Sequence, residues 1–157
     1  MISPGAWAHE SYCMTNSDTK ITKGGCFCGA VQYEVAGALR DVINCHCSQC
    51  TKLNGGVGAH SKARKENIRL TKDEGLSWYE ISENTRRGFC HKCGSGLFWQ
   101  PGQQDATGIV AGSIDGPTGL KTIGHIFVSE KSDFYEITNS LQQFQGSSNG
   151  ELAGDYL

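Results

Sequence analysis

The chain has 157 residues with 14 basic and 16 acidic side chains, a formal net charge of −2 that argues against bulk electrostatic binding to nucleic acid or anionic membranes. This length corresponds to one domain, large enough to bury a hydrophobic core without covalent or metal staples. No apolar run approaches the roughly 20 residues of a membrane span, and no signal-peptide core stands at the N-terminus, so we expect a cytoplasmic protein.

The two ends of the chain differ in pattern from its middle. Residues 1–20 are polar and show no hydrophobic period, which predicts a flexible N-terminal tail. Residues 146–157 are rich in glycine and serine, which predicts a flexible C-terminal tail. We therefore expect one folded domain over residues 21–145. Met14 stands just before the patterned sequence, so Met1 and Met14 both remain candidates for the natural start.

Between the tails, the patterned segments are short and typical of β-strands. Residues 30–36 alternate apolar and polar side chains and include β-branched and aromatic residues, as a half-buried strand does. Glycines and polar turn sequences separate the segments. Further strands are expected at residues 57–60, 68–70, 76–81, 87–89, 97–100, 109–113 and 122–128, and short helices at 48–53 and 132–144. The sequence thus predicts a mainly β fold with few short helices.

Eight cysteines are many for a non-exported chain of this length, and seven of them fall into three tight groups. Thiolates separated by one to three residues can turn onto one soft cation, and the glycine that follows the first and third groups allows a tight turn. The groups are Cys26 and Cys28; Cys45, Cys47 and Cys50; and Cys90 and Cys93.

The number of sulfurs in each group predicts two zinc sites of different kinds. The first and third groups together supply the four thiolates of a closed tetrahedral site, and we call them the four-cysteine cluster. The middle group, the three-cysteine cluster, supplies three thiolates and leaves a fourth position open, as a reactive zinc requires. This pairing is not the only one, because Cys13 or a histidine could close the three-cysteine cluster. Otherwise Cys13 is expected to be a free thiol in the N-terminal tail.

Disulfides, a redox pair and an iron–sulfur cluster compete with zinc as roles for these cysteines. Disulfides between such close neighbours have poor geometry, and nothing suggests an oxidising compartment. A thioredoxin-like redox pair at Cys90 and Cys93 lacks the surrounding βαβ pattern. An iron–sulfur cluster could use four thiolates, but the spacings differ from the familiar ferredoxin runs.

The same stretches resemble a known family. Residues 24–34 (GGCFCGAVQYE), 45–50 (CHCSQC) and 84–95 (NTRRGFCHKCGS), followed by 111–115 (AGSID) and 125–128 (HIFV), resemble the glutathione-dependent formaldehyde-activating enzyme family, whose relatives include centromere protein V. The resemblance runs from about Thr22 to Phe144. Phe134 stands where relatives often carry tryptophan, and the N-terminal extension is longer than usual; neither departure touches the grouped cysteines.

The resemblance implies a β-tent of short antiparallel sheets that is stabilised by two zinc ions per chain. It implies a structural zinc at the four-cysteine cluster and a catalytic zinc at the three-cysteine cluster. The implied activity is the condensation of formaldehyde with glutathione to S-(hydroxymethyl)glutathione, a reaction classed with the carbon–sulfur lyases. The expected partners are therefore a small-molecule thiol and an aldehyde.

The three-thiolate site suits this chemistry. A zinc held by three thiolates carries a net negative charge, so it polarises a carbonyl group only weakly. It can still bind a fourth sulfur and hold it as a thiolate at neutral pH. We therefore expect the glutathione sulfur to occupy the open position and to attack formaldehyde beside it.

Other candidate residues each have two interpretations. His46 could act as a catalytic proton donor to the new hydroxyl, although alternation along the chain points it away from the metal. Asp115 could be a second catalytic residue at the border of the pocket or, with Ser113, could build a glycine-rich turn. Arg86 and Arg87 could bind the carboxylates of glutathione, or they could form a solvated basic pair.

Several residues are expected to be structural, and the function itself has alternatives. His125 is expected to be a strand residue rather than a ligand, and Trp78, Phe98 and Trp99 are expected in the core. The competing function is a non-catalytic, zinc-stabilised binding module with two structural zincs, in which a fourth protein ligand closes the three-cysteine cluster. Zinc chemistry on a thiol other than glutathione is a further alternative, because nothing in the sequence specifies glutathione.

Overall fold

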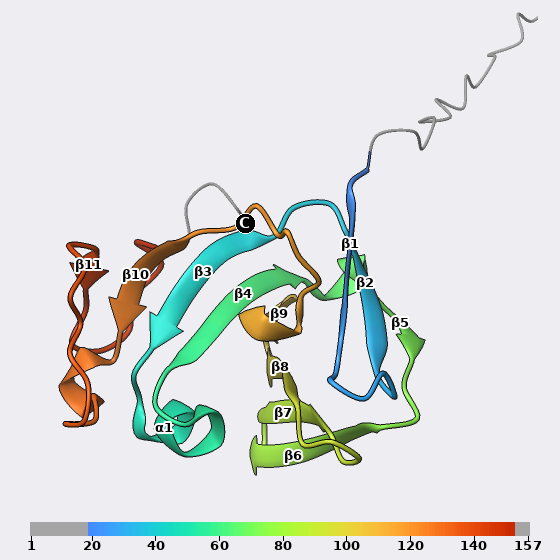
Figure 1. Cartoon of the computed structure of the whole chain (residues 1–157), viewed down its shortest axis with the longest axis horizontal. Coiled ribbons are helices and arrows are strands. Elements are labelled where there is room, and N and C mark those ends of the chain that lie inside the picture. The colour runs from blue at the N-terminus through green and yellow to red at the C-terminus, as the bar shows by residue number, and fades with distance from the viewer. Residues whose placement is uncertain (1–18, 153–157) are drawn as a thin grey trace, which may run out of the picture.

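Two β-sheets and one short α-helix make up the computed structural model, which describes residues 19–152 (Figure 1). The strands are β1 (Ile21–Gly25), β2 (Gln32–Ala36), β3 (Arg40–Cys45), β4 (Gly58–Arg64), β5 (Ile68–Lys72), β6 (Leu76–Ser82), β7 (Thr85–Cys90), β8 (Gly96–Pro101), β9 (Ala106–Val110), β10 (Thr122–Ile126) and β11 (Gln142–Gln143). The helix is α1 (Ser48–Asn54), and three single-turn 3₁₀ helices occupy Lys65–Asn67, Ala111–Ser113 and Val128–Glu130.

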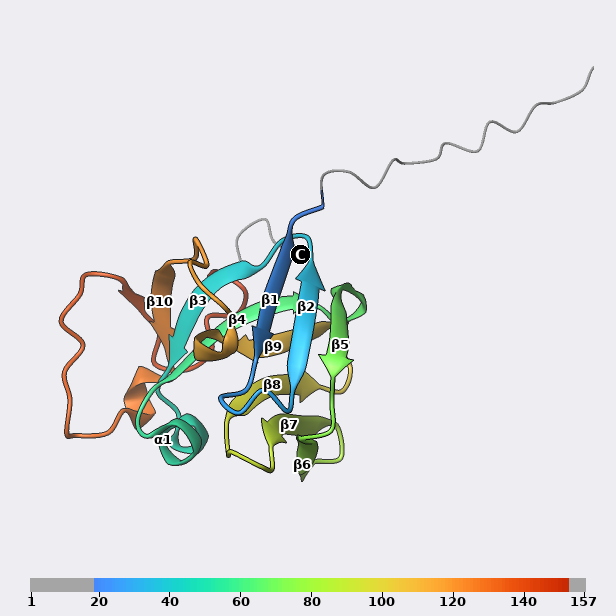
Figure 2. The same ribbon diagram turned by 45° about the vertical axis from the view of Figure 1, so that its right-hand side comes forward.

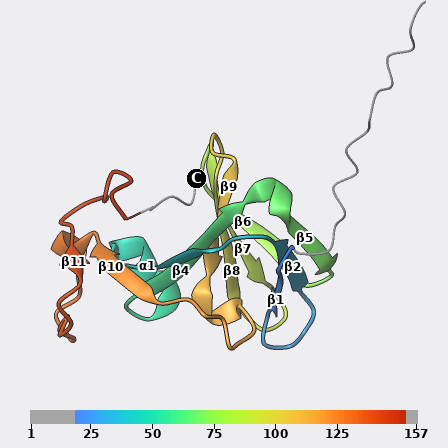
Figure 3. The ribbon, with the colours of Figure 1, turned by 90° about the horizontal axis from the view of Figure 1, so that it is seen from above.

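The smaller sheet has the strand order β1-β2-β5, and the larger sheet has the order β11-β10-β3-β4-β9-β8-β7-β6. All pairings are antiparallel except those of β10 with β3 and with β11, which are parallel. Figures 1 and 3 show β10, β11 and α1 at one end of the molecule, with β1, β2 and β5 at the other. The mainly β prediction is confirmed, with two parallel pairings in an otherwise antiparallel arrangement.

The hydrophobic core lies where the smaller sheet packs across the larger one (Figure 2). In β2, Tyr33 and Val35 are buried while the residues between and beside them are more exposed, as the two-residue period of a strand requires. The Tyr33 ring meets the ring of Phe98 from β8 edge-on, with centroids 5.1 Å apart. Ala63 of β4 and Ile109 of β9 are fully buried in the same core.

The expected strands are confirmed with two changes. Segment 109–113 divides, since β9 ends at Val110 and a 3₁₀ turn covers Ala111–Ser113, and segment 122–128 divides likewise, since β10 ends at Ile126 and a 3₁₀ turn covers Val128–Glu130. Three strands of the structure were not predicted as strands: β1, which contains two glycines, β3, and the two-residue β11. The helix predicted at residues 48–53 is confirmed as α1.

The helix predicted at residues 132–144 is wrong. This segment is irregular and contributes only β11 to a sheet. The side chain of Asn139 accepts a hydrogen bond from the backbone N–H of Leu141, and such local bonds compete with helical ones. The described chain also continues past the expected domain boundary at residue 145, because Leu152 is buried and packs against Gly124 of β10.

Two of the three aromatic residues expected in the core are placed there. Phe98 is buried in the core, and Trp78 packs against it. Trp99 follows Phe98 in the same strand and therefore faces the opposite side of the sheet, where it lines a cavity. The prediction that Trp99 belongs to this core is therefore wrong. Residues 19–152 include no helix with the length and apolarity of a membrane span.

The contact between the two sheets includes one buried hydrogen bond that can be tested. Ser113 donates to the carbonyl oxygen of Val110, so the Tyr33 hydroxyl donates to Ser113 Oγ over 2.7 Å. Replacing Tyr33 with phenylalanine should lower the free energy of unfolding by about 1 kcal/mol, because one buried hydrogen bond is lost while ring packing remains. Urea unfolding at a fixed zinc concentration measures the change. The matched control is Tyr79→Phe on exposed β6, and an equal loss in both variants would contradict the prediction.

Candidate functional site

The four-cysteine cluster joins two turns that are far apart in the sequence. Cys26 and Cys28 lie in the turn between β1 and β2, whereas Cys90 ends β7 and Cys93 lies in the turn to β8. All four sulfur atoms lie within 4.8 Å of one another. The Sγ atoms of Cys28 and Cys26 are 3.7 Å apart, and those of Cys28 and Cys90 are 3.8 Å apart. Zn–S bonds of about 2.3 Å in a tetrahedron put sulfurs about 3.8 Å apart, so this cluster fits zinc.

The backbone of both turns explains the glycines that follow the cysteines. Gly29 and Gly94 both have φ +78°, a conformation that favours glycine, and each donates its N–H to the carbonyl of the first cysteine in its group. Ser95 then joins the two turns, because its Oγ accepts from the N–H of Phe27 and lies 3.2 Å from Cys93 Sγ. The Ser95 hydroxyl and N–H lower the pKa of Cys93 to about 5. Ser95 thus favours the thiolate form of Cys93.

The three-cysteine cluster lies at the junction of β3 and α1. Cys45 is the last residue of β3, Cys47 caps the N-terminus of α1, and Cys50 is buried in the first turn of the helix. The N–H of Cys50 donates to Cys47 Sγ over 3.4 Å. The three sulfurs lie within 4.8 Å of one another, as ligands of one metal ion must.

Negative charge in the three-cysteine cluster is drawn toward Cys50. The pKa of Cys50 falls to about 6, chiefly because Cys45 donates a hydrogen bond to its sulfur. Burial opposes this decrease, whereas a hydrogen bond with Cys47 and the charge of Arg87 lower the pKa further. The same hydrogen bond raises the pKa of Cys45. Arg87 Nη2 lies 3.7 Å from Cys50 Sγ, and Gln49 Oε1 accepts from both Nε and Nη2 of the same guanidinium. Gln49 thus holds a positive charge against the cluster.

The predicted arginine pair is separated by the sheet. Arg86 and Arg87 are neighbours in β7, so their side chains leave opposite faces. Arg86 lies over the ring of Trp78, 4.1 Å from its centroid, and donates to Gln100. Only Arg87 of this pair lines the cavity beside the three-cysteine cluster.

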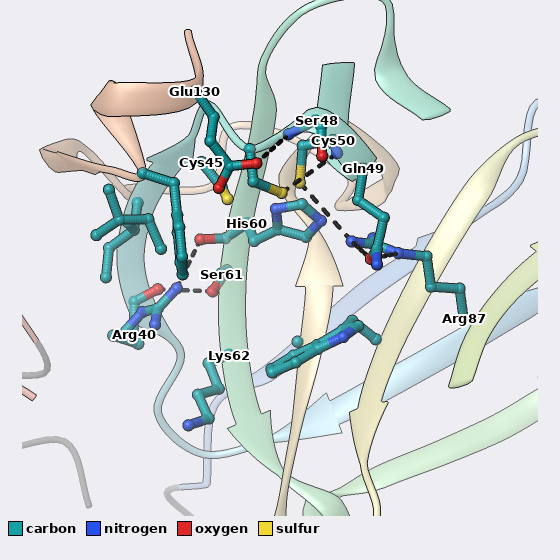
Figure 4. A pocket seen from close by; sticks show the side chains of 16 residues that line it. Arg40, Cys45, Ser48, Gln49, Cys50, His60, Ser61, Lys62, Arg87 and Glu130 are labelled. Carbon is teal, nitrogen blue, oxygen red and sulfur yellow. Dashed lines mark hydrogen bonds between the residues drawn. The ribbon is translucent and has the colours of Figure 1, made fainter. Parts of the chain in front are cut away.

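That cavity has a volume of about 420 Å³ and contains all three cysteines of the three-cysteine cluster in its lining. Figure 4 shows the labelled cysteines on one side of the cavity and two cations, Arg40 and Lys62, on the other. Burial, and then the charge of Arg40, lower the pKa of Lys62. The carboxylate of Glu130 accepts from the N–H of Ser48 at the start of α1. Apolar side chains complete the lining: Ile43, Trp99, Ile126 and Phe127.

His60 lies in the cavity lining beside the cysteines and Arg87 (Figure 4), and the sequence did not single it out. A Cβ added to Gly58 would lie 2.6 Å from His60 Cε1 and 2.7 Å from Cys50 Sγ, so the imidazole and the sulfur occupy the same face of Gly58. Gly58 and His60 belong to β4, in which Gly58, His60 and Lys62 lie on one face and the side chains of the residues between them lie on the other. This alternation could have grouped His60 with Lys62 from the sequence alone. It could not show that their face of the strand meets the cysteines, because that depends on the fold.

His46 is placed behind the three-cysteine cluster, away from the cavity lining. Its ring is buried, with Nε2 2.9 Å from Nδ1 of His125 and Nδ1 bonded to the hydroxyl of Tyr135. His125 Nε2 lies 3.0 Å from Asn139 Oδ1. His125 is thus a buried strand residue of β10, as expected.

The hydrogen positions in this network follow from one backbone donor. The N–H of Leu141 can only donate, so Asn139 Oδ1 is an acceptor, and His125 Nε2 must carry a hydrogen. A neutral His125 then accepts at Nδ1 from His46, whose own Nδ1 accepts from the hydroxyl of Tyr135. Burial, His125 and Lys131 lower the pKa of His46, which favours this neutral chain. Segment 131–141 is thereby attached to the loop that carries Cys45 and Cys47.

Asp115 and Cys13, two further residues singled out by the sequence, lie elsewhere. Asp115 is exposed, donates its N–H to the carbonyl of Lys23, and does not line the cavity beside the three-cysteine cluster. Ser113 is buried against Tyr33. Cys13 lies outside the described residues.

Comparisons with known proteins agree with this geometry. Residues 21–130 match the family model of the glutathione-dependent formaldehyde-activating enzyme. A Halomonas elongata protein that carries the name of the same enzyme is 27% identical over 133 residues, which cover 78% of this chain and 84% of that protein. The crystal structure of a Rhodobacter sphaeroides protein matches with a TM-score of 0.52 and 27% identity, over 64% of this chain and 97% of that one.

The matched span contains both cysteine clusters and the strands from β1 to β10. The span covers well over half of the chain, and its cysteines are gathered in space as the resemblance implied. The chain therefore belongs to the glutathione-dependent formaldehyde-activating enzyme family.

Proposed function

We propose that this protein is a zinc-dependent carbon–sulfur lyase that joins a thiol of the glutathione type to a small aldehyde such as formaldehyde. The product is an S-hydroxymethyl thiol adduct. The observation that supports this function best is the three-cysteine cluster in the wall of a cavity of about 420 Å³, within the usual size of small-molecule sites. The family description and the name of the Halomonas relative supply the two substrates.

Zinc is the metal that the sulfur donors favour. Seven thiolates in groups of four and three match the ligand chemistry of one structural and one catalytic zinc. When bound at the three-cysteine cluster, zinc would supply a position at which a substrate thiol is held as thiolate at neutral pH. Arg87 lies against Cys50 and offsets part of the negative charge that the thiolates gather there.

The far side of the cavity suits a thiol that carries carboxylates. Arg40 and Lys62 bring two positive charges close enough for each to influence the other, and a carboxylate between them would relieve their repulsion. The apolar side chains of Trp99 and Phe127 line the same cavity, and contact between them and a bound substrate would exclude water. A glutathione-type thiol can therefore place its sulfur at one side and an anionic end at the other.

The competing function, a binding module with two structural zincs, requires a fourth protein ligand at the three-cysteine cluster. Within residues 19–152, three ligand atoms gather at this cluster, against four at the other. This difference supports the catalytic function over the structural one, because a catalytic zinc keeps a position for substrate.

Substitution of one cysteine in each cluster separates the two roles. Cys47→Ser should reduce turnover of glutathione and formaldehyde by about 100-fold or more, because the substrate sulfur loses its position, while one zinc per chain remains. Cys93→Ser should instead remove the other zinc and destabilise the fold, because metal binding there contributes to folding. Zinc content, thermal unfolding and adduct formation by NMR measure the three effects. Full turnover in Cys47→Ser would contradict the proposed function.

The close approach at Gly58 offers a milder change to the three-cysteine cluster. An added Cβ would collide with Cys50 Sγ, so Gly58→Ala should weaken zinc binding there by about tenfold and leave the four-cysteine cluster unaffected. Competition with a chelator measures both affinities. Gly146→Ala is the matched control, since its added Cβ meets no atom within 4 Å. Two zinc affinities equal to those of the unsubstituted protein would show that Gly58 does not shape the site.

A further inference from the structure

One buried polar atom of the cavity lacks a partner. Among the side chains that the structure describes, His60 Nε2 is the only buried nitrogen or oxygen atom without a hydrogen bond. Buried polar groups are rarely left in this state, because an unmade hydrogen bond costs free energy. The ring lies in the lining of the cavity that contains the three cysteines, so the expected partner is a ligand of that cavity.

The hydrogen bond on the other side of the ring decides which nitrogen has the lone pair. The backbone of Gly58 forms a hydrogen bond that favours the protonated form of His60, so the ring donates to a carbonyl oxygen. Because Nε2 has no partner, the donor is Nδ1–H. Burial lowers the pKa of His60 to about 4, and the charges of Arg87 and Arg40 contribute. The neutral ring therefore presents the lone pair of Nε2 to the cavity.

The proposed reaction needs such an acceptor. When a thiol adds to an aldehyde, the S–H bond breaks, a C–S bond forms, the C=O π pair moves to oxygen, and the proton ends on that oxygen. The cations of the cavity only donate hydrogen bonds. Glu130 already accepts from Ser48, and Gln49 already accepts from Arg87. Among the described side chains, His60 Nε2 is the buried acceptor in this cavity lining that no protein group occupies.

We propose that His60 is a catalytic residue that accepts the proton of the substrate thiol at Nε2 and returns it to the aldehyde oxygen. The imidazole is neutral before and after the cycle, so atoms and charge balance with no further reactant. The charges of Arg87 and Arg40 destabilise the imidazolium, which promotes transfer of the proton onward to the oxygen. This inference rests on the proposed function, since it assigns a role within that reaction.

Chemical rescue distinguishes proton transfer from a structural role. In the zinc-loaded full chain, His60→Ala should lower the kcat for glutathione and formaldehyde by about 100-fold while both zincs remain. Added imidazole should fill the space that the side chain leaves and raise the kcat of His60→Ala by about tenfold. His60→Phe should lose the same activity without rescue, because its ring fills the space. Thr107→Ala, a change at a buried residue of β9 outside the cavity lining, should keep its kcat and show no response to imidazole.

A measurement without turnover tests the same contact. In ¹⁵N NMR of the zinc-loaded protein, glutathione should shift the Nε2 resonance of His60 and leave those of His46 and His125 unchanged. Unchanged kcat in His60→Ala, or loss of one zinc from both His60 variants, would overturn the inference; the second result would make His60 a metal ligand. If the unsubstituted protein does not turn over, the proposed function fails, and the glutathione-dependent shift still decides whether His60 contacts the thiol.

Discussion

The turns that contribute the four-cysteine cluster bring the two sheets together. Cys28 comes from the smaller sheet and Cys90 from the larger one, yet their sulfurs are 3.8 Å apart. The hydrogen bond from Phe27 to Ser95 joins the same two turns, and the N–H of Gly75 donates to the carbonyl of Ala30 beside them. A metal at this point would close the edge of the core, because Cys90 itself is fully buried.

With the two sheets joined, each central strand of the larger sheet serves the core with one face and the cavity with the other. In β8, Phe98 contacts Tyr33 in the core while Trp99 lines the cavity. In β4, Ala63 is fully buried in the core while His60 and Lys62 line the cavity. The cavity therefore has a rigid floor of strands, which keeps its cations and its imidazole at fixed positions relative to the cysteines.

The sequence predicted features that depend on residues close together in the chain, and it did not predict features that depend on contacts between distant segments. Cysteine spacing is local, and the groups that it indicated are gathered in space as clusters that could bind metal ions, since turns of a few residues bring the sulfurs of one group together. Strand alternation is also local, but it does not say which face meets the core, so Trp99 was assigned to the wrong side and His60 was not identified. The pairing of β10 beside β3 brings His46 and His125 together across 79 residues, and no short-range pattern encodes that contact.

The failed helix prediction at residues 132–144 has a structural reason that bears on the site. A regular helix would satisfy the backbone of this segment internally, whereas the irregular path brings Tyr135 to His46 and Asn139 to His125. Without these partners, two buried imidazoles behind the cysteine loop would have unsatisfied nitrogens, at a cost of roughly 1–3 kcal/mol each. The loop that carries the three cysteines is thus held from behind by this network and from the cavity side by Arg87 and Gln49. Under the proposed function, support from both sides would keep the three sulfurs in place while the fourth position exchanges its ligand.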